Sequence, residues 1–129
     1  DVELYELHSS PAYFGSVDVF LSHSWHDDPK AKWTAIDGWR RSFKRQNGRE
    51  PRLWIDKFCI DQTNIEANLK CLPCFEAGCQ RLLIVCGPTY LTRMWCIVEL
   101  FVFLEMLVFQ PQIYTTAPPP GMIHPWRHI

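Results

Sequence analysis

Three short apolar runs, at residues 17–22, 52–56 and 81–87, alternate along the chain with longer segments of helical pattern. The runs are rich in Val, Ile, Leu, Phe and Trp and end in polar or turn-forming residues, which is typical of buried strands. The third run is apolar throughout, so we expect that strand to be covered on both faces.

The first helical segment is predicted to run from Pro29 to about residue 45, with Asp28 as its N-cap and Gly48 ending it. Four residues at helical spacing give it an apolar face: Ala35, Ile36, Trp39 and Phe43. Four basic residues gather near its C-terminal end: Arg40, Arg41, Lys44 and Arg45. They could simply be solvated cations that suit the helix dipole, or they could hold a phosphate.

The second helical segment opens with Thr63 and Glu66 at the spacing of a capping box. Pro73 lacks a backbone N–H, so we expect this helix to kink or split near residue 72. Gly78 is expected to end it.

The third helical segment, residues 92–106, has Thr92 placed as a cap and is apolar on nearly every face, so we expect it to be buried. It carries two carboxylates, Glu99 and Glu105. The residues three and four positions from Glu99 offer no ion-pair partner. This carboxylate must therefore lie at the mouth of a cavity, find a partner elsewhere in the chain or reach solvent, whereas Glu105 is expected to be solvated.

The alternation of strands and helices predicts an α/β fold in which three parallel strands carry helices on both faces. In such sheets the loops that leave the C-terminal ends of the strands line the ligand crevice. These loops are residues 22–28, 56–62 and 86–93, and Glu99 is expected just below them. The glycine-rich dinucleotide motif and the Gly-Lys-Ser phosphate motif are both missing from the sequence.

The composition is that of a folded domain without a strong electrostatic field. Of 129 residues, 47% are hydrophobic and 14% aromatic, which argues against disorder. The formal net charge of −1 gives no overall attraction to nucleic acid or to an anionic membrane. No apolar run reaches the roughly 18–20 residues of a membrane span. The acidic N-terminal segment lacks the layout of a signal peptide, so we expect a cytoplasmic protein with reduced cysteines.

Six cysteines raise the question of a metal or redox site. Cys71, Cys74 and Cys79 have spacings that zinc could use, but a second ligand pair is absent and no His lies nearby in sequence. We therefore expect no metal site and interpret Cys71 and Cys74 as small core residues.

Three segments together resemble a TIR domain. Residues 18–24 resemble the family's first strand and the loop after it, and residues 90–100 resemble its Trp-Cys-x-x-Glu helix. Residues 53–62 occupy the place of the second strand and its loop, and they also resemble the Trp-Ile-Asp-x-x-Cys-Ile-Asn-Gln signature of heterokaryon-incompatibility domains. The resemblance covers roughly residues 17–106 and implies a flavodoxin-like sheet.

The resemblance implies a signalling domain of immunity or cell death. Many TIR domains hydrolyse the nicotinamide–ribose bond of NAD, and Glu99 occupies the position of their catalytic Glu. The substrate-binding residues expected here are His23, Ser24, Trp25, Asp56 and Trp95. The family commonly has an aromatic residue and an Arg where this chain has His23 and Ser24, and Trp25 could supply the stacking surface instead.

Two functions stay open. In the first, Glu99 alone would stabilise the oxocarbenium-like transition state of NAD cleavage, because the positively charged nicotinamide leaves without an acid; NAD is then the substrate and no cofactor is expected. In the second, the domain is not an enzyme, and it self-associates or binds other TIR domains.

We divide the chain into a lead-in at residues 1–15, a partial TIR-like domain at residues 16–109 and a Pro-rich tail at residues 110–129. The tail is expected to be irregular, with at most an edge strand at residues 112–116. A complete TIR domain continues with two more strands, and their absence suggests a fragment or a replaced C-terminus. Apolar faces of the 94–106 helix would then be bare, which marks a partner site or an aggregation hazard.

Overall fold

A computed structural model describes residues 8–59, 65–109 and 123–128 of the chain. Its centre is a parallel sheet of three strands: β2 (Val19–His23), β3 (Leu53–Trp54) and β4 (Leu82–Val85). The strand order is β3-β2-β4, so β2 lies in the middle. The predicted α/β class and the three parallel strands are therefore confirmed.

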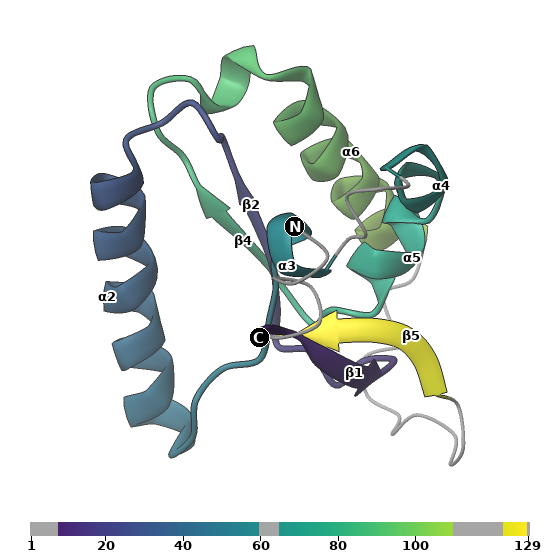
Figure 1. Cartoon of the computed structure of the whole chain (residues 1–129), viewed down its shortest axis with the longest axis horizontal. Helices are drawn as coiled ribbons and strands as arrows, with labels where there is room; N and C mark the ends of the chain where they lie inside the picture. The colour runs from purple at the N-terminus through teal and green to yellow at the C-terminus, as the bar shows by residue number, and fades with distance from the viewer. Residues whose placement is uncertain (1–7, 60–64, 110–122, 129) are drawn as a thin grey trace.

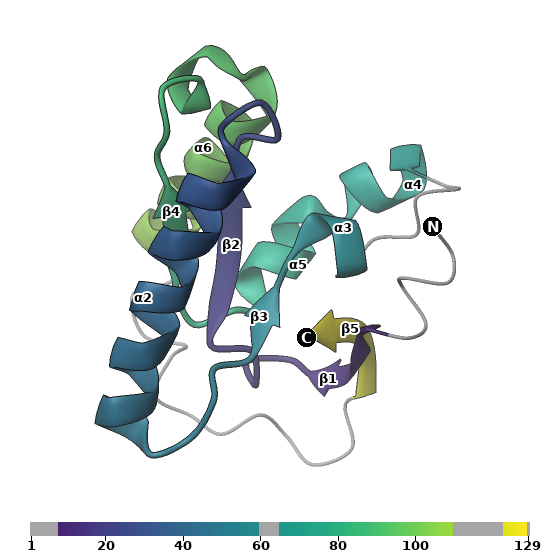
Figure 2. The same ribbon diagram turned by 60° about the vertical axis from the view of Figure 1, so that its left-hand side comes forward.

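Helices lie on both faces of this sheet, as predicted (Figure 1). One face carries α2 (Pro29–Asn47), and the other carries α5 (Leu72–Ala77) and α6 (Met94–Phe109). Three shorter elements complete the middle of the chain: α3 (Asp56–Cys59), α4 (Ile65–Lys70) and the 3₁₀ helix η1 (Tyr90–Thr92). Figure 2 shows α3, α4 and α5 leading from β3 away from α2.

Two hydrophobic clusters, one on each face of β2, hold these layers together. Successive side chains of a strand point to opposite faces. Phe20 therefore packs with Trp54 and Phe75 toward α5, whereas Leu21 packs with Ile36 of α2. The Phe20 and Trp54 rings stack with centroids 4.4 Å apart. β2 is thus buried on both sides.

The predicted ends of α2 are confirmed. The Asp28 carboxylate accepts hydrogen bonds from the backbone N–H groups of Lys30 and Ala31, and Pro29 is the first helical residue. Gly48 follows the helix in the left-handed conformation, with φ of 70°, which glycine adopts without strain.

Three of the four basic residues near the end of α2 form ion pairs with carboxylates. Arg40 and Lys44 approach Glu50 at 2.9 and 2.7 Å, and Arg41 approaches Asp37 at 2.7 Å. Exposed pairs of this kind contribute little stability each. They do neutralise much of the positive charge, which favours a solvated helix end over a phosphate site.

The second and third strands differ from their predictions. β3 stops at Trp54, and α3 begins at Asp56, where we expected the strand to end and a loop to follow. Asp56 is the first residue of α3, where a carboxylate suits the helix dipole, and it accepts a hydrogen bond from the N–H of Lys57. β4 is not covered on both faces, since Ile84 is 39% exposed. The reason is its place at the edge: among the described residues, β4 pairs only with β2.

The second helical segment splits as predicted. α4 ends at Lys70 and α5 begins at Leu72, with Pro73 in its first turn and Gly78 after its last residue. The expected cap, Thr63, lies outside the described residues.

The third helical segment begins later than predicted, so the expectation for Thr92 is wrong. Thr92 belongs to η1, and its hydroxyl donates to the Thr89 carbonyl instead of capping α6. The expectation that α6 is buried all round is also wrong. Its buried residues form one stripe, and large apolar residues on its other faces are exposed: Met94, Ile97, Val98, Phe101 and Leu104. The bare apolar surface expected on this helix is therefore present.

The two ends of the described chain meet in a second sheet. β1 (Ser10–Tyr13) pairs antiparallel with β5 (Ile123–His128), with Ser10 opposite His128. The two strands lie side by side in both views (Figures 1 and 2). The expectation of an irregular tail is therefore wrong for residues 123–128, and the lead-in also contains a strand. The possible strand at residues 112–116 lies outside the described residues.

The six cysteines are free thiols. Cys71 and Cys74 are exposed, so their interpretation as core residues is wrong, whereas Cys79 is completely buried. Within the described ranges, no three His, Cys, Asp or Glu side chains gather in a way that could hold a metal ion. In the same ranges, no helix combines the length and the apolar content that a bilayer crossing requires.

Candidate functional site

Glu99 is buried beside the C-terminal half of β2. Only 3% of the residue is exposed, although it is a carboxylate. It lies in the buried stripe of α6 between Cys96 and Phe103. Its Oε2 accepts a hydrogen bond from the hydroxyl of Ser22, at 2.5 Å. Of the situations considered from the sequence, the structure excludes bulk solvent and shows a partner, Ser22. Glu105 is exposed as predicted.

A chain of hydroxyl groups holds this carboxylate. Ser22 has one hydroxyl proton and donates it to Glu99, so the Tyr90 hydroxyl, 2.7 Å from Ser22 Oγ, must be the donor to Ser22. Tyr90 is 1% exposed, and burial raises its pKa to about 12. The tyrosine therefore stays protonated and fixes the direction of the chain toward Glu99.

Burial raises the pKa of Glu99 to about 7. The hydrogen bond from Ser22 lowers this pKa and the charge of Asp56 raises it, but loss of solvation is the largest effect. Glu99 is thus divided between its charged and neutral forms near neutral pH. A carboxyl group with such a pKa can both stabilise a developing positive charge and exchange a proton.

A second buried carboxyl group, Glu76, was not singled out by the sequence analysis. It lies in α5, is 0% exposed, and neither carboxyl oxygen has a hydrogen-bond partner. Burial, together with a smaller effect of the charge of Glu99, raises the pKa of Glu76 to about 9. Glu76 is therefore neutral at pH values where Glu99 ionises. One sequence feature could have revealed it, namely its place with Leu72, Phe75 and Cys79 in one helical stripe.

The expected substrate-binding residues separate into two groups in the structure. Trp95 is half-buried against the cluster on the α5 side and lies one helical turn before Glu99, and its side chain lowers the pKa of that carboxyl group. His23 and Trp25 instead line a cavity on the α2 side of the sheet. Ser24 is buried, and its hydroxyl lies 2.6 Å from that of Thr89.

Asp56, also expected to bind substrate, interacts both with the residues beside the cavity and with Glu99. It accepts a hydrogen bond from the Trp25 indole N–H at 2.9 Å, and its Oδ1 lies 3.9 Å from Nε2 of His23. Its charge also acts on Glu99. Burial lowers the pKa of His23 and outweighs the opposite effect of Asp56, so His23 is neutral near pH 7.

Asp27 joins the loop after β2 to the loop after β4. Its Oδ1 accepts hydrogen bonds from the backbone N–H and the hydroxyl of Thr89, at 2.9 and 2.8 Å. These bonds lower the pKa of Asp27. Gly87 lies so close to the Asp27 carboxylate that a β-carbon at this position would overlap it. The two loops above Glu99 are thus held in register by one carboxylate and one glycine.

Replacing Gly87 with Ala is expected to displace Asp27 and to lower the free energy of unfolding by about 1–3 kcal/mol, as overpacking does. Urea titration followed by circular dichroism measures this change. Gly38→Ala is the matched control, because a β-carbon there meets no atom within 4 Å. Position 38 lies in the interior of α2, so Gly38→Ala should raise the free energy of unfolding by up to about 1 kcal/mol. Equal stability of the Gly87→Ala variant and the wild type would contradict the expected displacement.

Comparison with models of protein families, with characterised proteins and with solved structures finds no match to this chain. The function must therefore be argued from the geometry of its own residues.

Proposed function

We propose that this chain is a TIR-like signalling domain that hydrolyses the nicotinamide–ribose bond of NAD, with Glu99 as the catalytic carboxylate. The observation that carries the proposal is the burial of Glu99 below the C-terminal ends of parallel strands, where α/β sheets bind ligands. The order β3-β2-β4 also supports it, because a flavodoxin-like sheet begins with the same arrangement of its first three strands.

The chemistry requires little beyond a fixed carboxylate. The bond between the nicotinamide nitrogen and ribose C1′ breaks, and its electron pair neutralises the pyridinium ring. The ribose then carries a developing positive charge, which ionised Glu99 would stabilise in surroundings of low polarity. Water adds to C1′ and releases a proton, for which Glu99 is the nearest base of suitable pKa, about 7.

The burial of Glu99 has a consequence for this activity. A group that is 3% exposed cannot contact a substrate until neighbouring side chains move. Trp95, half-buried beside Glu99, is the side chain best placed to open the way. We therefore expect turnover to require rearrangement of this region, which assembly of several copies could supply.

Release of nicotinamide from NAD by the purified chain tests the proposal directly. The reaction is followed by chromatography at low protein concentration and at the highest concentration that stays in solution. Release that rises more steeply than protein concentration would support activation by assembly. No release under either condition would reject the enzymatic function.

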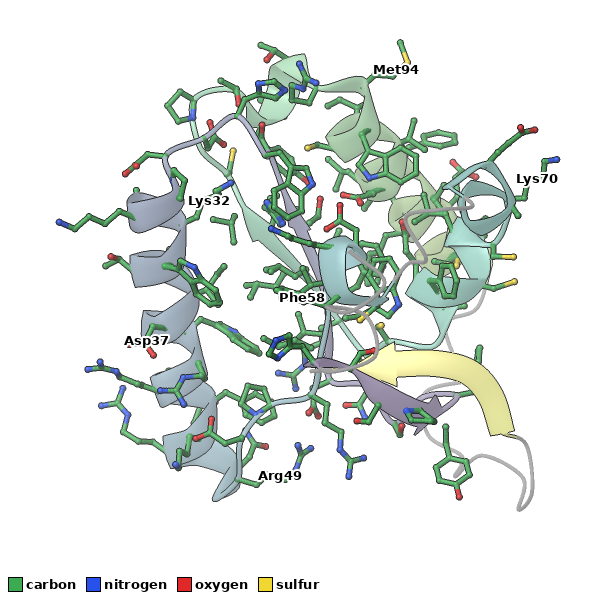
Figure 3. The ribbon with its side chains drawn as sticks, viewed as in Figure 1. Lys32, Asp37, Arg49, Phe58, Lys70 and Met94 are labelled. Atoms are coloured by element: carbon green, nitrogen blue, oxygen red, sulfur yellow. The ribbon has the colours of Figure 1, made fainter. Side chains whose placement is uncertain are left out.

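A second function, homotypic assembly without catalysis, is favoured by the exposed apolar surface of α6. Met94 is 82% exposed, Phe101 61% and Leu104 51%. In Figure 3 the Met94 side chain extends away from the rest of the molecule. β4 is an edge strand of the sheet, because within the described ranges no strand pairs with its outer side. Apolar surface of this kind marks an interaction site.

Replacing Phe101 with Glu is expected to weaken self-association by about tenfold or more, because it places a charge where an interface excludes water. Sedimentation velocity over a range of concentrations measures the change. Tyr13→Glu serves as the control, since Tyr13 is 55% exposed but lies on β1, away from α6. A wild-type chain that stays monomeric at every concentration would contradict assembly through this helix.

A further inference from the structure

A cavity of about 300 Å³ lies on the α2 side of the sheet. Leu21 and His23 of β2 line it, whereas Ser22 points to the other face and binds Glu99. The cavity is therefore separated from Glu99 by the strand itself. Figure 3 shows Lys32 of α2 and Phe58 of α3 both reaching into the space between α2 and the sheet.

Aromatic side chains form much of the cavity wall. Trp25, Trp33 and Phe58 line it, and the two tryptophans are 49% and 59% exposed. Large aromatic faces left in water beside a concave site are surfaces on which a planar ring can stack. The edge of the His23 ring packs against Trp25, with centroids 4.5 Å apart, and holds that indole in place.

Two ammonium groups flank the same indole. Lys32 Nζ lies 5.5 Å and Lys57 Nζ 5.6 Å from the centre of the Trp25 ring. Lys32 is only 9% exposed and donates one hydrogen bond, to the Ser24 carbonyl at 2.7 Å. An ammonium has three protons, so two remain for a ligand. A buried cation with one neutral acceptor is costly unless an anion joins it.

No carboxylate among the described residues lines the cavity or lies within ion-pair distance of either lysine. Asp56 is nearby, but it accepts the Trp25 indole N–H and the Lys57 backbone N–H. The start of α2 is not a rival anion site, because Asp28 already occupies its first N–H groups. The charge of Lys32 also acts on Asp27, but Oδ1 of Asp27 already accepts two hydrogen bonds from Thr89. Among the described residues neither ammonium is therefore in an ion pair, and both can bind an anion.

We propose that the cavity binds a nucleoside monophosphate, with its base stacked on Trp25 and Trp33 and its phosphate held by Lys32 and Lys57. A volume of about 300 Å³ is at the small end of ligand pockets, which suits one ring system and its phosphate rather than a dinucleotide. This binding does not depend on Glu99 or on NAD cleavage.

Isothermal titration calorimetry with AMP tests the inference, with adenosine and inorganic phosphate as separate probes. AMP should bind one site per chain and at least about tenfold more tightly than adenosine, because the phosphate adds charge-assisted hydrogen bonds. Saturable binding of AMP with this preference would support the inference. No heat of binding by AMP, or equal affinity for AMP and adenosine, would overturn it.

Two variants test the residues named. Trp33→Ala should weaken AMP binding about fivefold or more through lost stacking, and Lys57→Gln should weaken AMP but not adenosine. Lys30→Gln is the matched control, because Lys30 is an exposed lysine of α2 outside the cavity lining. Equal affinity in the Lys57→Gln and Lys30→Gln variants would overturn the assignment of the phosphate site. Glu99→Gln should bind AMP normally even if it releases no nicotinamide, so the two proposals can fail separately.

Discussion

Replacing Glu99 with Gln is expected to reduce nicotinamide release by about 100-fold or more while the domain stays folded. The glutamine amide keeps the shape of the side chain, and its oxygen can still accept the hydrogen bond from Ser22. It carries no negative charge, so the oxocarbenium-like transition state loses its counter-charge. The specificity constant for NAD measures the effect, and circular dichroism checks the fold.

The control for this variant is Glu105→Gln, on an exposed position of the same helix. It should leave nicotinamide release unchanged. The wild-type rate should also rise as pH passes upward through about 7, because only ionised Glu99 supplies the charge. Equal loss in both variants, or full activity of Glu99→Gln, would remove Glu99 from the proposed mechanism.

Replacing Glu76 with Met is expected to increase the free energy of unfolding by about 1–3 kcal/mol near neutral pH, which is the cost of a buried polar group without a partner. Methionine fills a similar volume and needs no hydrogen bond. Urea titration of both proteins measures the difference. Glu66→Met is the control, because the Glu66 side chain is 87% exposed and should change stability little.

The effect of Glu76 should grow with pH. Its pKa is about 9 in the folded chain and 4.5 without burial, so the folded state keeps a proton that the unfolded state releases between these values. The free energy of unfolding therefore falls as pH rises through this range. Glu99, with a pKa of about 7, adds a fall over the lower part of the range. Glu76→Met should flatten the profile, and an unchanged slope would show that Glu76 is not the group responsible.

Features that depend on residues close together in sequence could be predicted. Asp28, Pro29 and Gly48 fix the ends of α2 through contacts within a few residues. The apolar residues one turn away on its own helix marked Glu99 as unusual, but they left open whether it is buried or reaches solvent, and the structure shows that it is buried. The parallel direction of the strands could be predicted because helix-length segments separate them.

Features that depend on distant residues, or on turns and burial that the apolar pattern does not show, were missed. Thr92 looked like a cap, but its carbonyl partner, Thr89, belongs to a 3₁₀ turn that the apolar pattern does not show. The separation of the expected substrate residues depends on how distant elements pack, because His23 lies on β2, Asp56 on α3 and Trp95 on α6. Ser24 is held by Thr89, 65 residues away. Glu76 was missed because one acidic residue in a short helix usually reaches solvent.

The pairing of β1 with β5 affects how the chain is made. Ser10 leaves the ribosome long before its partner, His128, so β1 is synthesised well ahead of the strand that completes its ladder. The parallel core can assemble during this interval, because its most distant strands, β2 and β4, are both complete by residue 85. We expect the antiparallel sheet to form after the parallel core, since its pairing closes a longer loop than the pairing of β2 with β4.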